Sequence, residues 1–235
     1  MGLVDPGREG VDRSSGRAKL CCAIGADVSK DLINAAKAGD WIVCGWFTPD
    51  YRHWAETLIG DLERLGNPYH FEAVAKAKGG WSANTLMKAD VVLRSLNRYP
   101  GKRIVLLDVD CRVFGDLAPL AALPCDVAFF LRSRQRKDRW YSQLRPKANA
   151  PQTFLQPRSG TMLFAATDAA RNLVERWSAL SKSARAGQDD ESTLAMALGE
   201  GTGLALCALE TKWAAIGPGV ETKILHTSAH VHSQS

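Results

Sequence analysis

The sequence of 235 residues contains no apolar run near the roughly 20 residues needed to span a bilayer. Its N-terminus also lacks the charged-then-apolar layout of a signal peptide. Its six cysteines form no C-x-x-C pair, and four of them lie within apolar runs, where cysteine usually serves as a small hydrophobe. We therefore expect neither secretion nor a membrane span. A reduced cytoplasmic setting fits best, and peripheral membrane contact stays open.

Charge of one sign is in only slight excess. The net charge of +5 can attract phosphate groups or an anionic membrane surface, but it falls short of a nucleic-acid-binding signature. The length suits one α/β domain with a full core. Residues 1 to 18 are rich in Gly, Ser, Arg and Asp without an apolar period, which predicts a flexible leader before a single domain over residues 19 to 235.

Apolar runs alternate with apolar residues at helical spacing along the chain. This alternation predicts an α/β fold with a central, mainly parallel sheet flanked by helices. An Ala-rich segment from Ser29 is ambiguous and favours a short helix capped by that serine. The basic stretch 132–150 is expected to form a surface loop, and the chain from Leu204 onward to be irregular. We expect strands over residues 41–47, 69–74, 103–110, 126–131 and 161–165, and helices over 51–65, 82–98 with Ser82 as cap, 168–180 and 190–198.

Asp108 and Asp110 close the strand predicted over residues 103–110. Carboxylates at i and i+2 point to the same side, at the sheet edge where open α/β sheets bind ligands. Mg²⁺ or Mn²⁺ prefers carboxylate oxygen and can bridge a protein to a diphosphate. A bare D-x-D is often a solvated turn or a helix cap. Its position directly after an apolar run favours a metal site.

The stretch from Trp81 to Leu117 reads W-S-A-N-T-L-M-K-A-D-V-V-L-R-S-L-N-R-Y-P-G-K-R-I-V-L-L-D-V-D-C-R-V-F-G-D-L. This order of a helix bearing a lysine, a strand ending in D-x-D and an acidic turn resembles the donor-binding core of GT-A glycosyltransferases. It is similar to the putative nucleotide-diphospho-sugar transferase families and, more distantly, to glycosyltransferase family 8. The resemblance covers roughly residues 41 to 230. It implies a single Rossmann-like GT-A domain that moves a sugar from a nucleoside-diphosphate sugar, with UDP-sugar favoured, to an acceptor hydroxyl.

The resemblance assigns a metal shell. It places Asp108 on the nucleotide ribose or the metal and Asp110 directly on the metal. The segment I-L-H-T-S resembles the terminal strand of family 8 relatives, in which the histidine, here His226, completes the shell; an imidazole suits Mn²⁺ better than Mg²⁺. Lys88 matches the helix lysine, with Asn84 one turn before it on the same face. An exposed helix lysine and a structural histidine are the alternatives.

Two further segments carry candidate sugar contacts. Residues 156–164 resemble the N-S-G-x-x-x-F element beside the sugar, where Gly160 allows close approach, although Arg158 stands where the family often has Asn. Residues 188–194 resemble the element D-[QE]-x-x-[LF]. There Asp190 would bind sugar hydroxyls, steady an oxocarbenium ion or take the acceptor proton, unless it only favours the positive end of a helix. Asp190 and Lys88 are the predicted catalytic residues.

The exit of the first predicted strand, F-T-P-D-Y, resembles the uridine-binding turn of these families. It adds Thr48 and Tyr51 to the predicted donor contacts, and Tyr51 packed on the core is the alternative. The expected partners are thus the sugar donor and a glycan, lipid-linked or protein acceptor, while nucleic acid is not expected.

Other classes share parts of this pattern. A haloacid dehalogenase-type phosphatase also uses D-x-D, but that motif normally opens its fold, whereas here more than a hundred residues precede it. Sugar nucleotidyltransferases begin with a Gly-rich phosphate loop that is absent near this N-terminus. A degenerate, non-catalytic nucleotide-sugar-binding module remains open. A nucleic-acid binder acting through the loop with Trp140 and Tyr141 also remains open.

Overall fold

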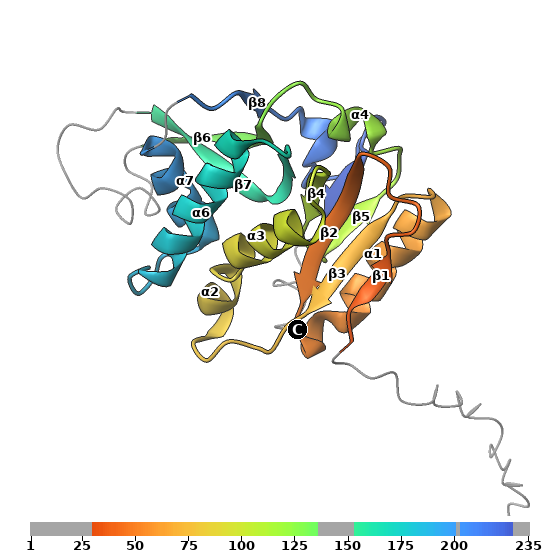
Figure 1. Cartoon of the computed structure of the whole chain (residues 1–235), viewed down its shortest axis with the longest axis horizontal. Coiled ribbons are helices and arrows are strands. Elements are labelled where there is room, and N and C mark those ends of the chain that lie inside the picture. The colour runs from red at the N-terminus through yellow and green to blue at the C-terminus, as the bar shows by residue number, and fades with distance from the viewer. Residues whose placement is uncertain (1–29, 136–152, 201–202, 228–235) are drawn as a thin grey trace, which may run out of the picture.

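The computed structural model describes residues 30–135, 153–200 and 203–227, which form helices and strands around a central sheet (Figure 1). The predicted leader, Ser29, and the part of the predicted basic loop from residue 136 onward lie outside these residues. The strands are β1 Leu32–Asn34, β2 Trp41–Phe47, β3 Tyr69–Ala73, β4 Arg103–Leu107, β5 Cys111–Val113, β6 Val127–Gln135, β7 Thr153–Phe164, β8 Leu206–Ala208 and β9 Ile224–His226. The helices are α1 Arg52–Arg64, α2 Gly80–Thr85, α3 Lys88–Arg98, α4 Ala118–Ala121, α6 Asp168–Lys182 and α7 Asp190–Gly199, with 3-10 turns η1 Pro49–Tyr51 and η2 Thr211–Trp213.

Seven strands form the central sheet in the order β1-β3-β2-β4-β7-β6-β8. Strands β2, β3, β4, β6 and β8 run in one direction, and β1 and β7 run in the other. The predicted α/β class with a mainly parallel central sheet is therefore confirmed. A second, two-stranded sheet pairs β5 with β9.

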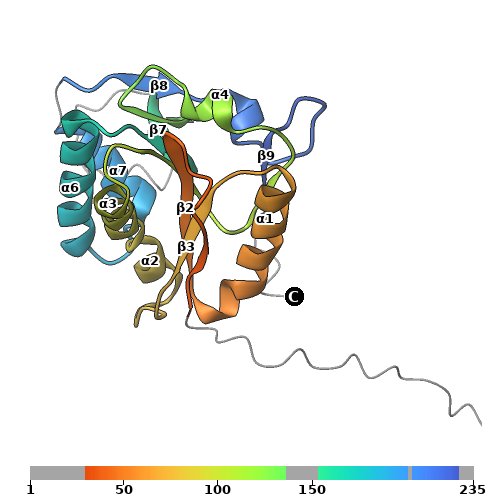
Figure 2. The ribbon, with the colours of Figure 1, turned by 45° about the vertical axis from the view of Figure 1, so that its right-hand side comes forward.

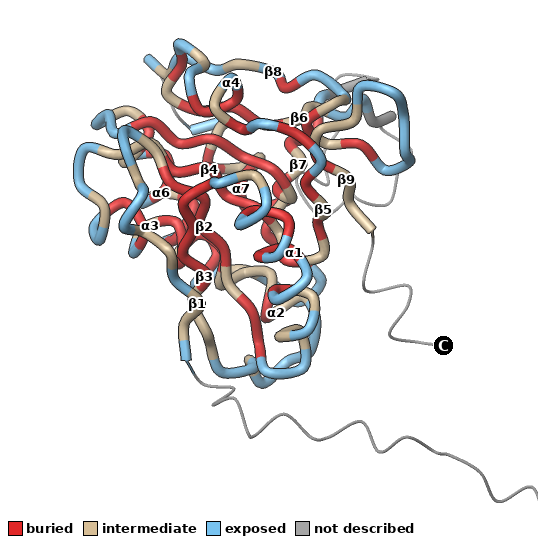
Figure 3. Tube along the Cα trace, turned by 90° about the vertical axis from the view of Figure 1, so that its right-hand side faces the viewer, coloured by how far each residue is buried: buried red, intermediate tan, exposed pale blue. Residues whose placement is uncertain are grey.

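Helices cover both faces of the central sheet (Figure 2), with α3, α6 and α7 on one side and α1 on the other. Alternate residues of β2 accordingly enter two different cores: Ile42 and Cys44 pack with α3 and α6, whereas Val43 and Phe47 pack with α1. Burial on both faces explains why β2 is apolar throughout and β4 is apolar after Arg103. Figure 3 shows the buried residues concentrated along these strands. None of the helices in the described ranges is long and apolar enough to cross a membrane.

The helix predicted over residues 82–98 is wrong in one respect, because it is two helices. Two glycines with positive φ, Gly79 and Gly80, set the start of α2, so Ser82 lies inside that helix instead of capping it. The amide of Met87 then bonds the carbonyl of Asn84, three residues back, at 3.1 Å. This tighter turn separates α2 from α3 and makes Lys88 the first residue of the second helix.

Several strands occur where the sequence predicts none. The segment expected to be a helix after Ser29 contains β1, since its antiparallel pairing with β3 overrides local propensity. Strand β6 continues through residues 132–135, which we expected to begin a loop, because it pairs with β7 along its whole length. Strands β8 and β9 occupy the region expected to be irregular, and both are three residues long.

Candidate functional site

A cavity of about 860 Å³ opens beside the carboxyl ends of β2 and β4. Strand β2 ends immediately before Thr48, and β4 ends immediately before Asp108, which is the edge where open α/β sheets bind ligands. The structure brings all of the sequence-predicted site residues to the lining of this one cavity. They are Thr48, Tyr51, Asn84, Lys88, Asp108, Asp110, Gly160, Asp190 and His226.

A buried lysine joins two of the predicted carboxylates. Lys88 Nζ lies 2.8 Å from Asp108 Oδ1 and 2.7 Å from Asp190 Oδ2, with only 4% of the lysine side chain exposed. The same ammonium donates to the hydroxyl of Ser159 at 3.0 Å, and that hydroxyl donates to Asp190 Oδ2 at 2.6 Å. Lys88 begins α3 and Asp190 begins α7, so two helix starts and β7 meet at this cluster. Lys88 is therefore not an exposed helix lysine.

The electrostatics of this cluster leave negative charge in excess. Burial, together with the charges of Asp110 and Asp190, raises the pKa of Asp108 to about 6, although Lys88 acts against the rise. Burial alone would lower the pKa of Lys88, but its attraction to Asp108 and Asp190 outweighs burial and raises that pKa. Lys88 thus shares one ammonium between two carboxylates, and Asp110 adds a negative charge beside Asp108, an arrangement that favours the entry of a cation.

Asp110, Cys111 and His226 form the group that can hold this cation among the described residues. One ligand atom from each lies within 4.8 Å of the others, and a carboxylate, a thiol and an imidazole are all metal-binding groups. The amide and hydroxyl of Thr227 hold the Asp110 carbonyl at 3.0 and 2.6 Å. Asp108, which the resemblance also implies for the metal, has Oδ1 on Lys88.

The histidine of this group is tightly positioned. Its Nε2 lies 3.0 Å from Thr161 Oγ1, and its Nδ1 lies 3.3 Å from Cys111 Sγ. Burial lowers the pKa of His226 to about 4, which keeps the ring neutral and able to bind a metal. A Cβ on Gly160 would lie 2.4 Å from His226 Cε1 and 3.3 Å from Asp108 Oδ2. Glycine at position 160 therefore lets β7 pass close to both groups. The ligand atoms of Asp110, Cys111 and His226 fit a divalent cation.

The remaining predicted residues lie near the carboxyl end of β2. Asn84 Oδ1 accepts the amide of Ala77 at 2.7 Å, so this side chain also fixes the loop before α2. Thr48 donates to Asp50, whose other oxygen binds Lys76 Nζ at 2.6 Å. Tyr51, half-buried, ends the 3-10 turn that follows β2 and packs against the α1 side of the core. Both the donor-contact role and the packing alternative thus remain compatible with its position.

Sequence reasoning missed several residues in or beside the lining. Ser159 contacts both Lys88 and Asp190, and Cys111, next to the lining, lies against His226. The sequence predicts a role for neither. Glu191 is held by Arg158 at 3.0 Å, and burial raises the pKa of its carboxyl to about 7 even though Arg158 lowers it. The sequence signal that could have found them is their position in the chain. Next to the predicted Gly160 and Asp190 stand Arg158, Ser159 and Glu191.

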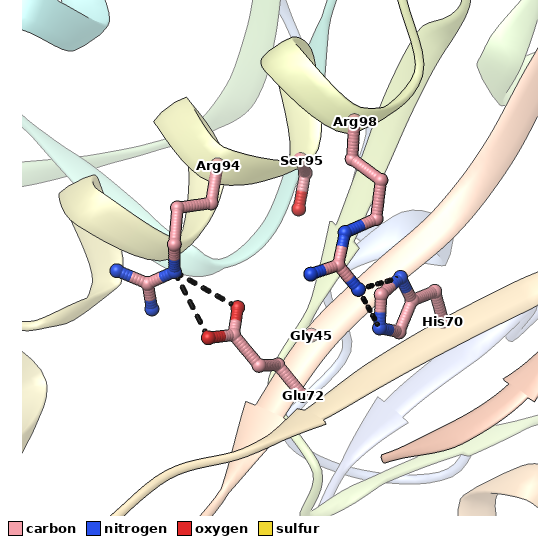
Figure 4. A pocket seen from close by; sticks show the side chains of 6 residues that line it. All are labelled: Gly45, His70, Glu72, Arg94, Ser95 and Arg98. Atoms are coloured by element: carbon pink, nitrogen blue, oxygen red, sulfur yellow. Dashed lines mark hydrogen bonds and ion pairs between the residues drawn. The ribbon is translucent and has the colours of Figure 1, made fainter.

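A second group of charges lies on the α3 face of β3 (Figure 4). Arg94 Nε contacts the Glu72 carboxylate at 2.9 and 3.0 Å, and Arg98 Nη1 lies 2.9 Å from His70 Nε2. The hollow between these side chains has no space for a water-sized molecule. We therefore interpret it as a packing contact between α3 and β3, and not as a ligand site.

No family model matches the sequence, and no curated protein matches it. Solved structures do match. A glycosyltransferase involved in the glycosylation of the major capsid of PBCV-1 is 10% identical with a TM-score of 0.57, covering 81% of this chain and 93% of that one. The WbbM bifunctional glycosyltransferase is 13% identical with a TM-score of 0.51; 83% of this chain is covered, but only 47% of WbbM. At such identities the likeness concerns the fold, and the chain has the GT-A fold of these glycosyltransferases.

Proposed function

We propose that the protein is a metal-dependent glycosyltransferase, which moves a sugar from a nucleoside-diphosphate sugar to an acceptor hydroxyl. The observation that carries this proposal is the meeting, in one cavity, of a metal-binding group around Asp110 and His226 with a buried Lys88–Asp190 pair. The fold shared with solved glycosyltransferases supports the same reaction class.

The diphosphate side of the donor lies toward Asp110 and His226 in this proposal. A divalent cation such as Mn²⁺ or Mg²⁺, when bound there, neutralises charge that builds on the departing diphosphate. Asp108 contacts the nucleotide ribose or the same cation. The excess of carboxyl groups over ammonium groups around Lys88 supports a site that is completed by added positive charge.

The sugar side of the donor lies toward Asp190. Lys88 and Ser159 both contact Oδ2 of this carboxylate, which fixes its orientation before any sugar arrives. In this position Asp190 binds sugar hydroxyls and stabilises positive charge that develops at the anomeric carbon. Lys88 acts by holding Asp190 and Asp108 in place and by balancing their charge.

The nucleotide base lies toward the exit of β2. Thr48 and Tyr51 follow that strand and line the cavity, so a uracil ring stacked on Tyr51 makes UDP-sugar the favoured donor. The backbone at Gly160 approaches the sugar next to the cation-binding side, because a Cβ there would collide with His226. The acceptor is a glycan, a lipid-linked sugar or a protein hydroxyl.

Calorimetry with UDP, GDP, CDP and ADP, each with and without Mn²⁺, tests the proposal. We expect UDP to bind only with Mn²⁺, and the binding to vanish in Asp110→Ala. At a ligand concentration of 100 times Kd, such binding adds about 2.7 kcal/mol to the free energy of unfolding. Glu175→Ala, an exposed change on α6, is the matched control and should bind as the wild type does. Absence of metal-dependent binding by every nucleotide would refute the proposal.

A non-catalytic nucleotide-sugar-binding module is the remaining alternative, and it predicts the same calorimetry. The two are separated by slow hydrolysis of the donor, which an active transferase carries out when water replaces the acceptor. No observation on the described residues favours the phosphatase alternative.

A further inference from the structure

Strand β7 contacts the parts of the candidate site in the order of its residues. Thr161 Oγ1 lies 3.0 Å from His226 Nε2, in the group that can hold the cation. Two residues earlier, the hydroxyl of Ser159 donates to Asp190 at 2.6 Å, on the proposed sugar side. A donor that extends from the cation to Asp190 along this strand leaves the part of the cavity beside the residues before Ser159 for the acceptor.

The antiparallel pair of β6 and β7 forms the cavity wall in that part. Two cross-strand pairs face the cavity, Phe130 with Arg158 and Arg132 with Gln156. All four residues line the cavity, as expected for residues that alternate along two paired strands and share one face. The wall therefore presents two arginines to a bound acceptor.

The charges of this wall are not balanced. Arg132, which is exposed, is the diagonal neighbour of Arg158 across the two strands, a relation that puts Cα atoms roughly 7–8 Å apart. Glu191 contacts Arg158 Nε at 3.0 Å through one oxygen and accepts Gln156 Nε2 at 2.5 Å through the other. Burial raises the pKa of Glu191 to about 7. At neutral pH this carboxyl therefore carries less than one full negative charge against two guanidinium groups.

We infer that this wall binds an anionic group of the acceptor, a carboxylate or a phosphate, through Arg132 and Arg158. The inference rests on the proposed function, because it names the acceptor class of the same site. Guanidinium groups recognise carboxylate and phosphate through paired N–H donors. The bond from Arg158 to Glu191 uses Nε, one of the five N–H donors of that group. The acceptor is accordingly an acidic sugar or a sugar phosphate, with its reacting hydroxyl toward Asp190.

A purely structural role for the two arginines is the competing explanation. In that case Arg132 is a solvated surface charge, and Arg158 only orients Glu191. The neighbouring carboxylate of the lining, Asp189, accepts the amide of Ser192 at 2.8 Å and so caps α7. The two explanations differ in the effect of an anionic group on acceptor affinity, which can be measured.

Calorimetry on the full chain saturated with UDP and Mn²⁺ tests the inference, because the nucleotide then fills the donor side. The probes are glucuronate, galacturonate and glucose 6-phosphate, each compared with its neutral parent sugar. We expect at least one anionic sugar to bind at least about tenfold more tightly than its parent. Arg132→Gln and Arg158→Gln should each abolish this preference. Arg132→Lys should retain part of it, because lysine keeps the charge without the paired donors.

A matched control removes the same charge elsewhere. Arg185 is exposed and follows α6, outside the lining of the cavity. Arg185→Gln should keep the full preference for the anionic sugar. A loss in this variant equal to that in Arg132→Gln would mean that the net charge of the protein causes the preference, and would overturn the inference.

The remaining outcomes separate the inference from the proposed function. Equal affinity for anionic and neutral sugars in protein that binds UDP with Mn²⁺ would overturn the inference and leave the transferase intact. A preference for UDP-glucuronate over UDP-glucose that Arg132→Gln removes would place the anion on the donor sugar, and would also overturn it. An Arg132-dependent preference for anionic sugars in protein that fails to bind any nucleotide would support the anion site and refute the proposed function.

Discussion

The cluster of charged side chains at the cavity and the cluster around His70 differ in how well their charges are balanced. At the cavity, the pKa of Asp108 is raised to about 6 by burial and neighbouring carboxylates. At the β1 edge, the pKa of Asp31 is lowered: burial opposes the change, but bonds from His70 and the amide of Ala73 outweigh it. Carboxyl groups are thus destabilised in their charged form at the first cluster and satisfied at the second.

The opposite pKa shifts of Asp108 and Asp31 distinguish a candidate site from a structural contact. The types of residue in the two clusters do not. Both clusters combine carboxylates with a buried basic group, Lys88 in one and His70 in the other. Only the first opens onto a cavity with room for a ligand. Carboxyl groups whose pKa is shifted by burial and neighbouring charges, and which line a cavity, are typical of functional sites. A bound ligand or cation stabilises their charged form.

The largest expected effect on stability comes from Lys88→Met. The change removes the ammonium group that Asp108 and Asp190 share and leaves two carboxylates close together. This should lower the free energy of unfolding by about 3 kcal/mol. Arg98→Met in the edge cluster is the counterpart. Because half of the Arg98 side chain is exposed, we expect a loss below about 1 kcal/mol. Urea denaturation measures both, and equal losses would contradict the distinction between the clusters.

His70→Asn should destabilise the protein without touching nucleotide binding. His70 is buried and contacts Asp31 at 3.0 Å, Arg98 at 2.9 Å and Tyr99 at 2.8 Å. Losing these contacts should cost about 2 kcal/mol. The affinity for UDP with Mn²⁺, measured by calorimetry on the folded variant, should stay at the wild-type value. A clear fall in that affinity would mean that the edge cluster belongs to the site.

Glu191→Gln should flatten the pH dependence of stability. The folded-state pKa of Glu191 is about 7, above its ordinary value, so the folded protein retains a proton that the unfolded chain releases. Stability therefore declines as pH rises from about 4.5 to 7. Between pH 5 and 7.5 the wild type should lose about 2 kcal/mol more than the variant in urea denaturation. Parallel curves for the two proteins would contradict the burial of this carboxyl.

Gly160→Ala should weaken metal binding more than it disturbs the fold. The added Cβ would lie 2.8 Å from His226 Nδ1, so the ring must move and Co²⁺ or Mn²⁺ affinity should fall at least about tenfold. Gly60→Ala on α1 meets nothing within 4 Å, and it should raise stability by up to about 1 kcal/mol with unchanged metal affinity. Calorimetric titration of both variants makes the comparison, and an unaltered affinity in Gly160→Ala would be inconsistent with a ligand role for His226.

The sequence predicts the long elements well, because their patterns are local. Strand β2 has its expected bounds, since the run Trp41–Phe47 is apolar throughout. Helix α1 begins and ends within one residue of the expected 51–65, because its apolar residues keep helical spacing. The short strands β1, β8 and β9 carry too few residues to form a pattern, and they exist only through pairing with distant partners.

The candidate site is predictable where motifs carry it and unpredictable where distant segments meet. Asp108 and Asp110 can be found from the strand that precedes them. The contact of Ser159 with Lys88 spans 71 residues, and that of Cys111 with His226 spans 115. No spacing rule reaches across such separations. The sequence therefore predicts no role for Cys111, although it directly follows the D-x-D motif.

Donor hydrolysis tests the central claim most directly. The wild type is incubated with a panel of nucleoside-diphosphate sugars, and release of the nucleoside diphosphate is followed with a divalent cation present, then with chelator. We predict cation-dependent release, strongest with a UDP-sugar, that is lost in Asp110→Ala and kept in Glu175→Ala. Release that continues unchanged in chelator or in Asp110→Ala would contradict the account. So would the absence of release from every donor in protein that binds UDP with Mn²⁺.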